Sequence, residues 1–117
     1  MPRPQKSVRP RFRIFWGEEI AIGPGKAELL QAILDTGSIQ QAAASLNMSY
    51  MRAWKLVHTM NECFKEPLVG AHRGGKQKGG AWLTPFGSRI LKLYLSLERK
   101  SLANTKLIWR ELLKALR

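Results

Sequence analysis

The chain lacks the residues that would build disulfides and membrane spans. Among its 117 residues only Cys63 is a cysteine, which excludes a disulfide within the chain. No run of about 18 apolar residues is available to cross a bilayer. The basic N-terminus is not followed by the apolar segment that a secretory signal requires. These absences predict a cytoplasmic protein of a reducing compartment, with no membrane partner.

Residues suited to catalysis are also few. Asp35 is the only aspartate, and His58 and His72 have no partner at the spacing of a metal pair. Cys63 falls on or beside the buried face of a predicted helix, where it serves best as a small core residue. We therefore expect no enzyme, no metal site and no cofactor.

Positive charge, in contrast, is abundant and unevenly distributed. Twenty Lys and Arg against eight Asp and Glu give a formal net charge of +12 at pH 7. Ten of the twenty cations fall in three segments without an acid, residues 1–13, 49–58 and 70–80. On so small a body this charge gives a positive potential of several kT over much of the surface. The expected partner is a polyanion, which would bind where these three basic segments lie on the surface of the protein.

The apolar periodicity predicts one domain that is mainly α with a small β component. Residues 1–10, with three prolines, are expected to form a flexible basic arm. The domain itself is assigned to residues 11–98, beginning with a hairpin over 12–22 and a helix over 24–36. Residues 99–117 are expected to form a helical extension that serves as the dimerisation element. The buried stripe of the first helix is expected to be Ala27, Leu30, Ile33 and Leu34.

Two further helices joined by a tight turn follow. Ser38 and Gln41 have the spacing of a capping box, in which the serine oxygen accepts the amide of Gln41 and the glutamine side chain reaches back. Asn47 suits the left-handed backbone of a tight helix exit, and Ser49 can cap the next helix. The predicted buried stripes are Ile39, Ala42, Ala43 and Leu46, then Ala53, Leu56, Val57, Met60 and Phe64. Residues 38–64 therefore predict a helix-turn-helix, with an ordinary helical hairpin as the alternative.

The exposed side of the second helix of this pair carries the predicted base contacts, because a recognition helix presents its N-terminal residues to base edges. Arg52 is suited to guanine, Lys55 to guanine or a phosphate, and Tyr50 or Met51 to a thymine methyl or a sugar. A solvated basic face is the alternative, and Tyr50 or Trp54 could instead pack on the first helix. The predicted DNA contacts are Ser49, Tyr50, Met51, Arg52 and Lys55, together with Ser38 and Gln40 at the start of the preceding helix.

A basic, glycine-rich segment lies between two short apolar stretches. Residues 73–80 contain four glycines and no apolar side chain. The order Gly-x-x-x-x-Gly-Lys-Ser/Thr and the strand-to-helix junction of a phosphate loop are both missing. A β-hairpin wing fits better, in which the glycines let the backbone approach the duplex. The predicted phosphate contacts of this wing are Arg73, Lys76 and Lys78.

The C-terminal third is rich in large apolar residues. Thr84 and Pro85 predict a cap and a first helical turn. Apolar side chains recur at helical spacing up to Leu97 and again from Ile108, and the polar residues 101–105 between them are compatible with one helix or two. This region supplies more apolar surface than one small domain needs, which predicts a homodimer formed through it. The alternative is that these side chains complete the core of a monomer.

Several short motifs together resemble a known family. They are Gly37-Ser38-Ile39, Gln41-Ala42-Ala43, Leu46-Asn47-Met48-Ser49-Tyr50, Arg52-Ala53-Trp54, Glu66-Pro67-Leu68-Val69 and Leu83-Thr84-Pro85-Phe86-Gly87. Over roughly residues 11–98 the chain is similar to the N-terminal winged-helix domain of the molybdate-responsive ModE-type regulators, related to the DNA-binding domain of LysR-type regulators. The resemblance implies a bacterial, nucleoid-associated transcription regulator that binds a palindromic site on double-stranded DNA as a homodimer.

The chain also departs from the family. Full-length members carry C-terminal oxyanion-binding domains, and only about 20 residues follow the likeness here, so molybdate binding by this chain is not expected. Two other functions stay open on sequence alone. One is a nonspecific architectural DNA-binding or RNA-binding protein, and the other is a winged helix that binds only proteins.

Overall fold

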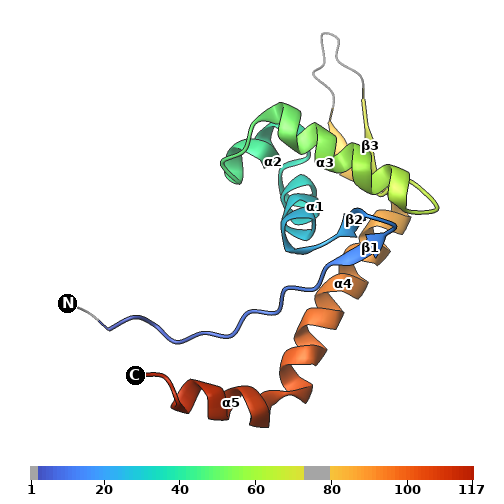
Figure 1. Ribbon diagram of the computed structural model, residues 1–117. Helices are drawn as coiled ribbons and strands as arrows, with labels where there is room; N and C mark the ends of the chain where they lie inside the picture. Colours follow the sequence, from blue (N-terminus) through green and yellow to red (C-terminus); the bar gives the residue numbers. More distant parts are fainter. Residues whose placement is uncertain (1–2, 73–79) are drawn as a thin grey trace.

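Helices dominate the part of the chain that the structure describes, residues 3–72 and 80–117 (Figure 1). In this computed structural model, five helices and two small antiparallel sheets make up that part. The elements are β1 (Ile14–Trp16), β2 (Glu19–Ile22), α1 (Pro24–Thr36), α2 (Ile39–Ser45), α3 (Tyr50–Cys63), β3 (Val69–Ala71), β4 (Ala81–Leu83), α4 (Pro85–Asn104) and α5 (Lys106–Lys114). The prediction of a mainly α winged helix-turn-helix is confirmed.

The N-terminal hairpin and α1 follow the sequence prediction in their bounds. β1 and β2 pair in antiparallel fashion, and Gly17 turns between them with a φ of 63°. Helix α1 begins with a proline in its first turn and ends at Gly37, whose φ of 71° is left-handed. The Gly37 N–H donates to the carbonyl of Ile33 at 2.8 Å, which closes the helix end.

The predicted buried stripe of α1 was partly wrong. Leu29 is fully buried, whereas Leu34 is 54% exposed. The helix packs against α2, β4 and α4, and the side that faces them is centred on Leu29, Leu30 and Ile33. Leu34 is turned about 100° away from Ile33 around the helix, which directs it to solvent.

Local capping positions α2 and α3. The Ser38 oxygen accepts the N–H of Gln41 at 3.2 Å, but Gln41 does not complete the capping box. The Ser38 N–H donates instead to the hydroxyl of Thr36 at 3.4 Å, because the turn at Gly37 brings that residue within reach. Asn47 adopts the predicted left-handed backbone with a φ of 56°.

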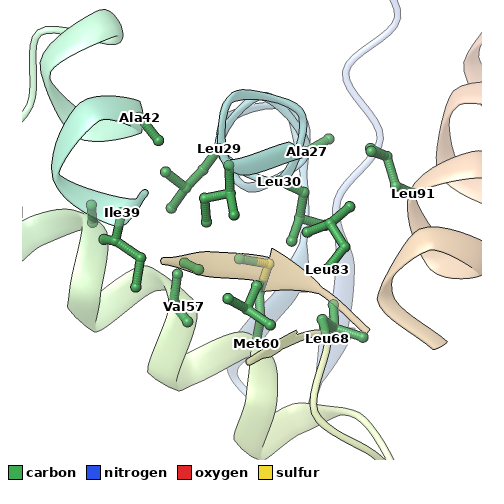
Figure 2. Packing of buried hydrophobic residues seen from close by; sticks show 14 of the residues in the cluster. Ala27, Leu29, Leu30, Ile39, Ala42, Val57, Met60, Leu68, Leu83 and Leu91 are labelled. Carbon is green, nitrogen blue, oxygen red and sulfur yellow. The ribbon is translucent and has the colours of Figure 1, made fainter. Parts of the chain in front are cut away.

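One apolar core is shared by the four helices α1, α2, α3 and α4 and by the strands β3 and β4 (Figure 2). These two strands are here called the wing strands. Ala42, Ala43 and Ala53 are at most 1% exposed, and these small side chains let α2 and α3 cross at close range. Leu30, Met60 and other fully buried residues fill the centre. Helix α5 contributes no buried residue.

The wing strands are attached to the helix-turn-helix at two places. β3 pairs with β4 in the register Val69 to Leu83, and the ladder continues as the His72 N–H donates to Gly80 at 3.0 Å. At the start of β4, the Ala81 N–H donates to the carbonyl of Gly37, between α1 and α2, at 2.8 Å. The second attachment is made by Asn61 of α3.

The Asn61 side chain forms three hydrogen bonds with the backbone around β3. Its oxygen accepts the N–H groups of Leu68 at 2.8 Å and Val69 at 3.2 Å, and its nitrogen donates to the carbonyl of Val69 at 3.1 Å. An amide is the neutral side chain that both donates and accepts in this way. Asn61 therefore fixes the C-terminal half of α3 against the base of the wing.

Helix α4 starts beside the same segment. Thr84 caps it by accepting the N–H of Gly87 at 2.9 Å and donates its own hydroxyl to Pro67 at 2.7 Å. Gly87 lies directly against the carbonyl of Leu68, where an added Cβ would stand 2.0 Å from the oxygen. This contact permits glycine alone.

The terminal region forms two helices. Helix α4 ends at Asn104 and α5 begins at Lys106, with Thr105 between them. Across the break the Trp109 indole N–H donates to the carbonyl of Leu102 at 2.9 Å, which holds the bend. The question left open by the polar residues 101–105 is thereby resolved as two helices.

Residues 3–13 contain no helix or strand and run in extended form to β1. The Tyr94 hydroxyl of α4 donates to the carbonyl of Phe12 at 2.8 Å. Burial raises the pKa of Tyr94, and the nearby Glu98 carboxylate raises it further, so this hydroxyl keeps its proton. The arm and α5 lie on the same side of the molecule, remote from the wing strands (Figure 1).

We predict that Gly87→Ala lowers the free energy of unfolding by about 2 to 4 kcal/mol, because the new methyl group must displace the Leu68 backbone. Urea denaturation of both proteins measures the difference. Gly25→Ala in α1 is the matched control, since nothing lies within 4 Å of its added Cβ. Equal stability of the Gly87 variant and the wild type would contradict the contact.

We also predict that Asn61→Ala costs about 1 to 3 kcal/mol of stability, because it leaves the amides of Leu68 and Val69 without their acceptor. Asn61→Asp keeps both acceptors but places a charged carboxylate oxygen against the Val69 carbonyl, so it should also destabilise the fold. Thermal and urea unfolding of both variants measure the losses. An alanine variant as stable as the wild type would show that these hydrogen bonds do not hold the wing strands to α3.

Candidate nucleic-acid interface

The predicted base-contacting residues lie on the solvent side of α3. Ala53, Val57 and Met60 bury the opposite side against the core. Tyr50 is 50% exposed and Met51 59% exposed. The remaining predicted contacts of this segment, Ser49, Arg52 and Lys55, are exposed as well. Each of the five is thus accessible to solvent at the start of α3.

The sequence left open whether Tyr50 or Trp54 packs on the first helix or faces a partner. Packing of Tyr50 or Trp54 on α1 would bury their rings, but Trp54 is 44% exposed and neither residue belongs to the core cluster. About half of each side chain is exposed, and Trp54 lies about 100° from Lys55 and about 160° from Arg52 around α3.

Electrostatics distinguishes the first half of α3 from its end. Arg52 and Lys55 take part in no ion pair among the residues that the structure describes. The only acid of α3 is Glu62 in the last turn, 3.9 Å from the His58 imidazole. The first two turns consequently present positive charge that no neighbouring carboxylate neutralises, as a phosphate-rich partner requires.

The serines predicted to contact DNA also act as helix caps. The Ser49 oxygen accepts the N–H of Arg52 at 3.1 Å, which satisfies one of the free amides at the start of α3. Its hydroxyl proton is left over for an acceptor such as a phosphate. Ser38 caps α2 in the same way and is half-buried, whereas Gln40 next to it is exposed.

The predicted phosphate contacts of the wing, Arg73, Lys76 and Lys78, lie outside the described residues. The strands that lead into this segment are described, and they end at Ala71 and begin again at Ala81. On β4 the Trp82 ring packs over Gly70 and lies 4.9 Å from the His72 ring.

Sequence reasoning overlooked two features of α3. One is Asn61, which a sequence pattern does not distinguish from any polar residue at the end of a helix. The other is a stack between the rings of Trp54 and His58, whose centroids are 5.2 Å apart with planes 5° from parallel. The spacing of four residues was a usable signal, because such residues are neighbours on a helix surface.

Other kinds of site find no support in residues 3–72 and 80–117. No group of three or more His, Cys, Asp or Glu is placed to hold a metal ion there. No helix in this part of the chain has the length and apolar character needed to cross a membrane.

The chain is similar in sequence to several ModE proteins. The chain is 44% identical over 78 residues to the molybdenum transport protein ModE of Azotobacter vinelandii, which covers 67% of the chain and 29% of that protein. It is 40% identical to the transcriptional regulator ModE of Haemophilus influenzae, over 70% of the chain and 32% of the relative. With the DNA-binding transcriptional dual regulator ModE of Escherichia coli K12 the identity is 38%, over 66% and 29%. The names of the last two agree with the interpretation of a regulator rather than an enzyme.

The fold has a solved counterpart in ArgP from Mycobacterium tuberculosis. The TM-score is 0.51 at 21% identity, over 71% of this chain and 30% of that one. The chain spans about a third or less of the length of these relatives. Residues 25–88, more than half of the chain, match the family described as bacterial regulatory helix-turn-helix proteins of the lysR family. The chain therefore belongs to the LysR family of bacterial regulatory helix-turn-helix proteins, with ModE regulators among its relatives.

Proposed function

We propose that this chain is a sequence-specific transcriptional regulator that binds a palindromic operator on double-stranded DNA as a homodimer. The observation that carries the proposal is the solvent side of α3. Its first two turns combine exposed Arg52 and Lys55 with exposed Tyr50 and Met51, and no acid lies among them. Guanidinium and ammonium groups match guanine and phosphate, and apolar side chains match thymine methyl groups.

In this proposal α3 lies in the major groove, and its N-terminal residues meet the base edges. Arg52 reads guanine through its paired N–H groups, while Lys55 binds guanine or a phosphate. Ser49, Ser38 and Gln40 contact the backbone of the duplex. The basic wing segment neutralises adjacent phosphates through its cations, which are Arg73, Lys76 and Lys78.

The homodimer is supported by the exposed apolar side of α5. Ile108 is 67% exposed and Leu112 65%, and the two lie one turn apart on the same side of α5. Leu116, which follows the end of α5, is 54% exposed. The alternative, in which these side chains complete the core of one chain, is disfavoured because α5 buries none of its residues. An exposed surface of this kind is characteristic of an interface, and a second copy is the partner that always accompanies the chain.

A dimer also accounts for a palindromic operator. One winged helix has too few base contacts for high specificity, and a two-fold pair doubles them on an inverted repeat. We place the interface in α4 and α5, most of which follows the matched residues 25–88. The rival function is nonspecific binding of DNA or RNA, for which the net charge of +12 would suffice.

We predict that Arg52→Ala weakens binding to the best duplex by about 1 to 3 kcal/mol and relaxes the choice of base at one position, because a base contact carries discrimination. Lys76→Ala is the control for a phosphate contact and should weaken specific and random duplexes alike. Titrations with both duplexes at one salt concentration give the comparison. Equal losses on specific and random DNA for Arg52→Ala would support the nonspecific rival.

We further predict that the wild type sediments as a dimer at micromolar concentration and that Leu112→Glu shifts it to monomer, because the carboxylate must be desolvated in the apolar interface. Leu107→Glu is the matched control. Leu107 is 81% exposed and lies about 140° from Leu112 around the helix, on the side with the charged residues. A wild-type monomer, or a dimer that survives Leu112→Glu, would place the interface elsewhere or remove it.

A further inference from the structure

Trp54 is a large indole with an unusual position. It is 44% exposed on α3, and the ring contact that the structure gives it is His58 of the same helix. Neither residue belongs to the core cluster or to the partly buried side chains around it. The exposed part of Trp54 leaves apolar surface in water, and a bound partner that covers it would gain free energy.

The location of the indole restricts what that partner can be. Trp54 is the fifth residue of α3, one turn after Tyr50 and next to Lys55, so it stands within the segment that meets the duplex in the proposed function. Tyr50, Trp54 and His58 follow one another at intervals of four and form a ridge of rings along one flank of the exposed side. Lys55 follows the indole directly in the chain, whereas the His58 end of the ridge lies 3.9 Å from the Glu62 carboxylate. The surface around the indole is therefore polar and charged, which suits DNA better than an apolar protein surface.

The chemistry of the indole selects one group in the major groove. The ring has a single donor, its N–H, and no acceptor, so it reads few of the polar base edges. Its apolar faces suit the C5-methyl group of thymine, which is the apolar feature that distinguishes thymine from the other bases there. We propose that Trp54 is a specificity-determining residue that packs on a thymine methyl group, and that His58 positions its ring. This inference rests on the proposed function of α3.

The role of His58 follows from the geometry of the stack. The two ring planes are 5° from parallel at a centroid separation of 5.2 Å, so the imidazole stacks on one face of the indole, while Trp54 stays 44% exposed. Fixing an exposed side chain before binding reduces the entropy lost when the complex forms. His58 is accordingly a positioning residue that acts through Trp54.

The test removes the methyl group from the DNA and the ring from the protein. The full chain first selects its best duplex from a random pool, and each thymine of that duplex is then replaced in turn by deoxyuridine. We expect the wild type to lose about fourfold in affinity at one thymine of each half-site, the value of one buried methyl group. With Trp54→Ala, affinity for the thymine duplex should fall about tenfold and the difference between thymine and deoxyuridine should vanish.

Two controls keep the result specific. Trp16→Ala removes an indole that is 64% exposed on β1, and it should leave the deoxyuridine effect intact. Trp54→Gln provides a second, polar replacement on the same exposed site and should behave as Trp54→Ala does. Affinity for random duplex should stay within about twofold in both Trp54 variants, because phosphate contacts are untouched.

The variants of His58 separate stacking from other roles. His58→Phe keeps a ring against the indole and should retain the deoxyuridine effect, whereas His58→Ala should reduce it. If the phenylalanine variant behaves like the alanine variant, His58 acts through its nitrogens and the positioning role is wrong.

The possible outcomes test the role of Trp54 separately from the proposed function on which it rests. If no duplex is enriched from the pool, both fail. If a duplex is enriched and Arg52→Ala weakens it while both Trp54 variants bind it like the wild type, the inference fails and the proposed function stands. A change in oligomeric state without a change in thymine discrimination would assign Trp54 to a protein interface and also overturn the inference.

Discussion

The three hydrogen bonds of the Asn61 side chain determine how α3 and the wing strands are oriented toward each other. A helix in a groove and a wing on the adjacent backbone act together only if the angle between them is fixed. Asn61 sets this angle at the C-terminal half of α3, and the bond from Ala81 to the carbonyl of Gly37 sets it at the turn before α2. The contact of Gly87 with Leu68 then holds α4 against the segment that precedes β3.

The parts of the fold that the sequence predicts well are those determined over a few residues. Ser49 and Thr84 cap the helices that follow them, and Asn47 takes the left-handed turn, because each interaction closes within three or four positions of the chain. Such interactions depend little on the rest of the molecule. The end of α2 and the starts of α3 and α4 follow from them.

The parts that the sequence predicts poorly depend on distant partners. The side of α1 that is buried depends on where α2, β4 and α4 lie, so Leu29 and Leu34 exchange their expected roles. Asn61 bonds to residues seven and eight positions away through a loop, which has no periodic signature. The break at Thr105 is likewise held by a side chain four residues further on, the Trp109 indole, and not by a helix-breaking residue.

The exposed side of α3 and the exposed apolar side of α5 are separate surfaces with different chemistry, which is the division that a dimeric regulator requires. The central claim is that two copies read an inverted repeat. Selection of duplexes from a random pool tests it most directly, because the enriched sequences report specificity and half-site spacing together. The account predicts two inverted half-sites with centres about 34 Å apart, one turn of DNA. Absence of enrichment, or enrichment of a single unpaired half-site, would contradict it.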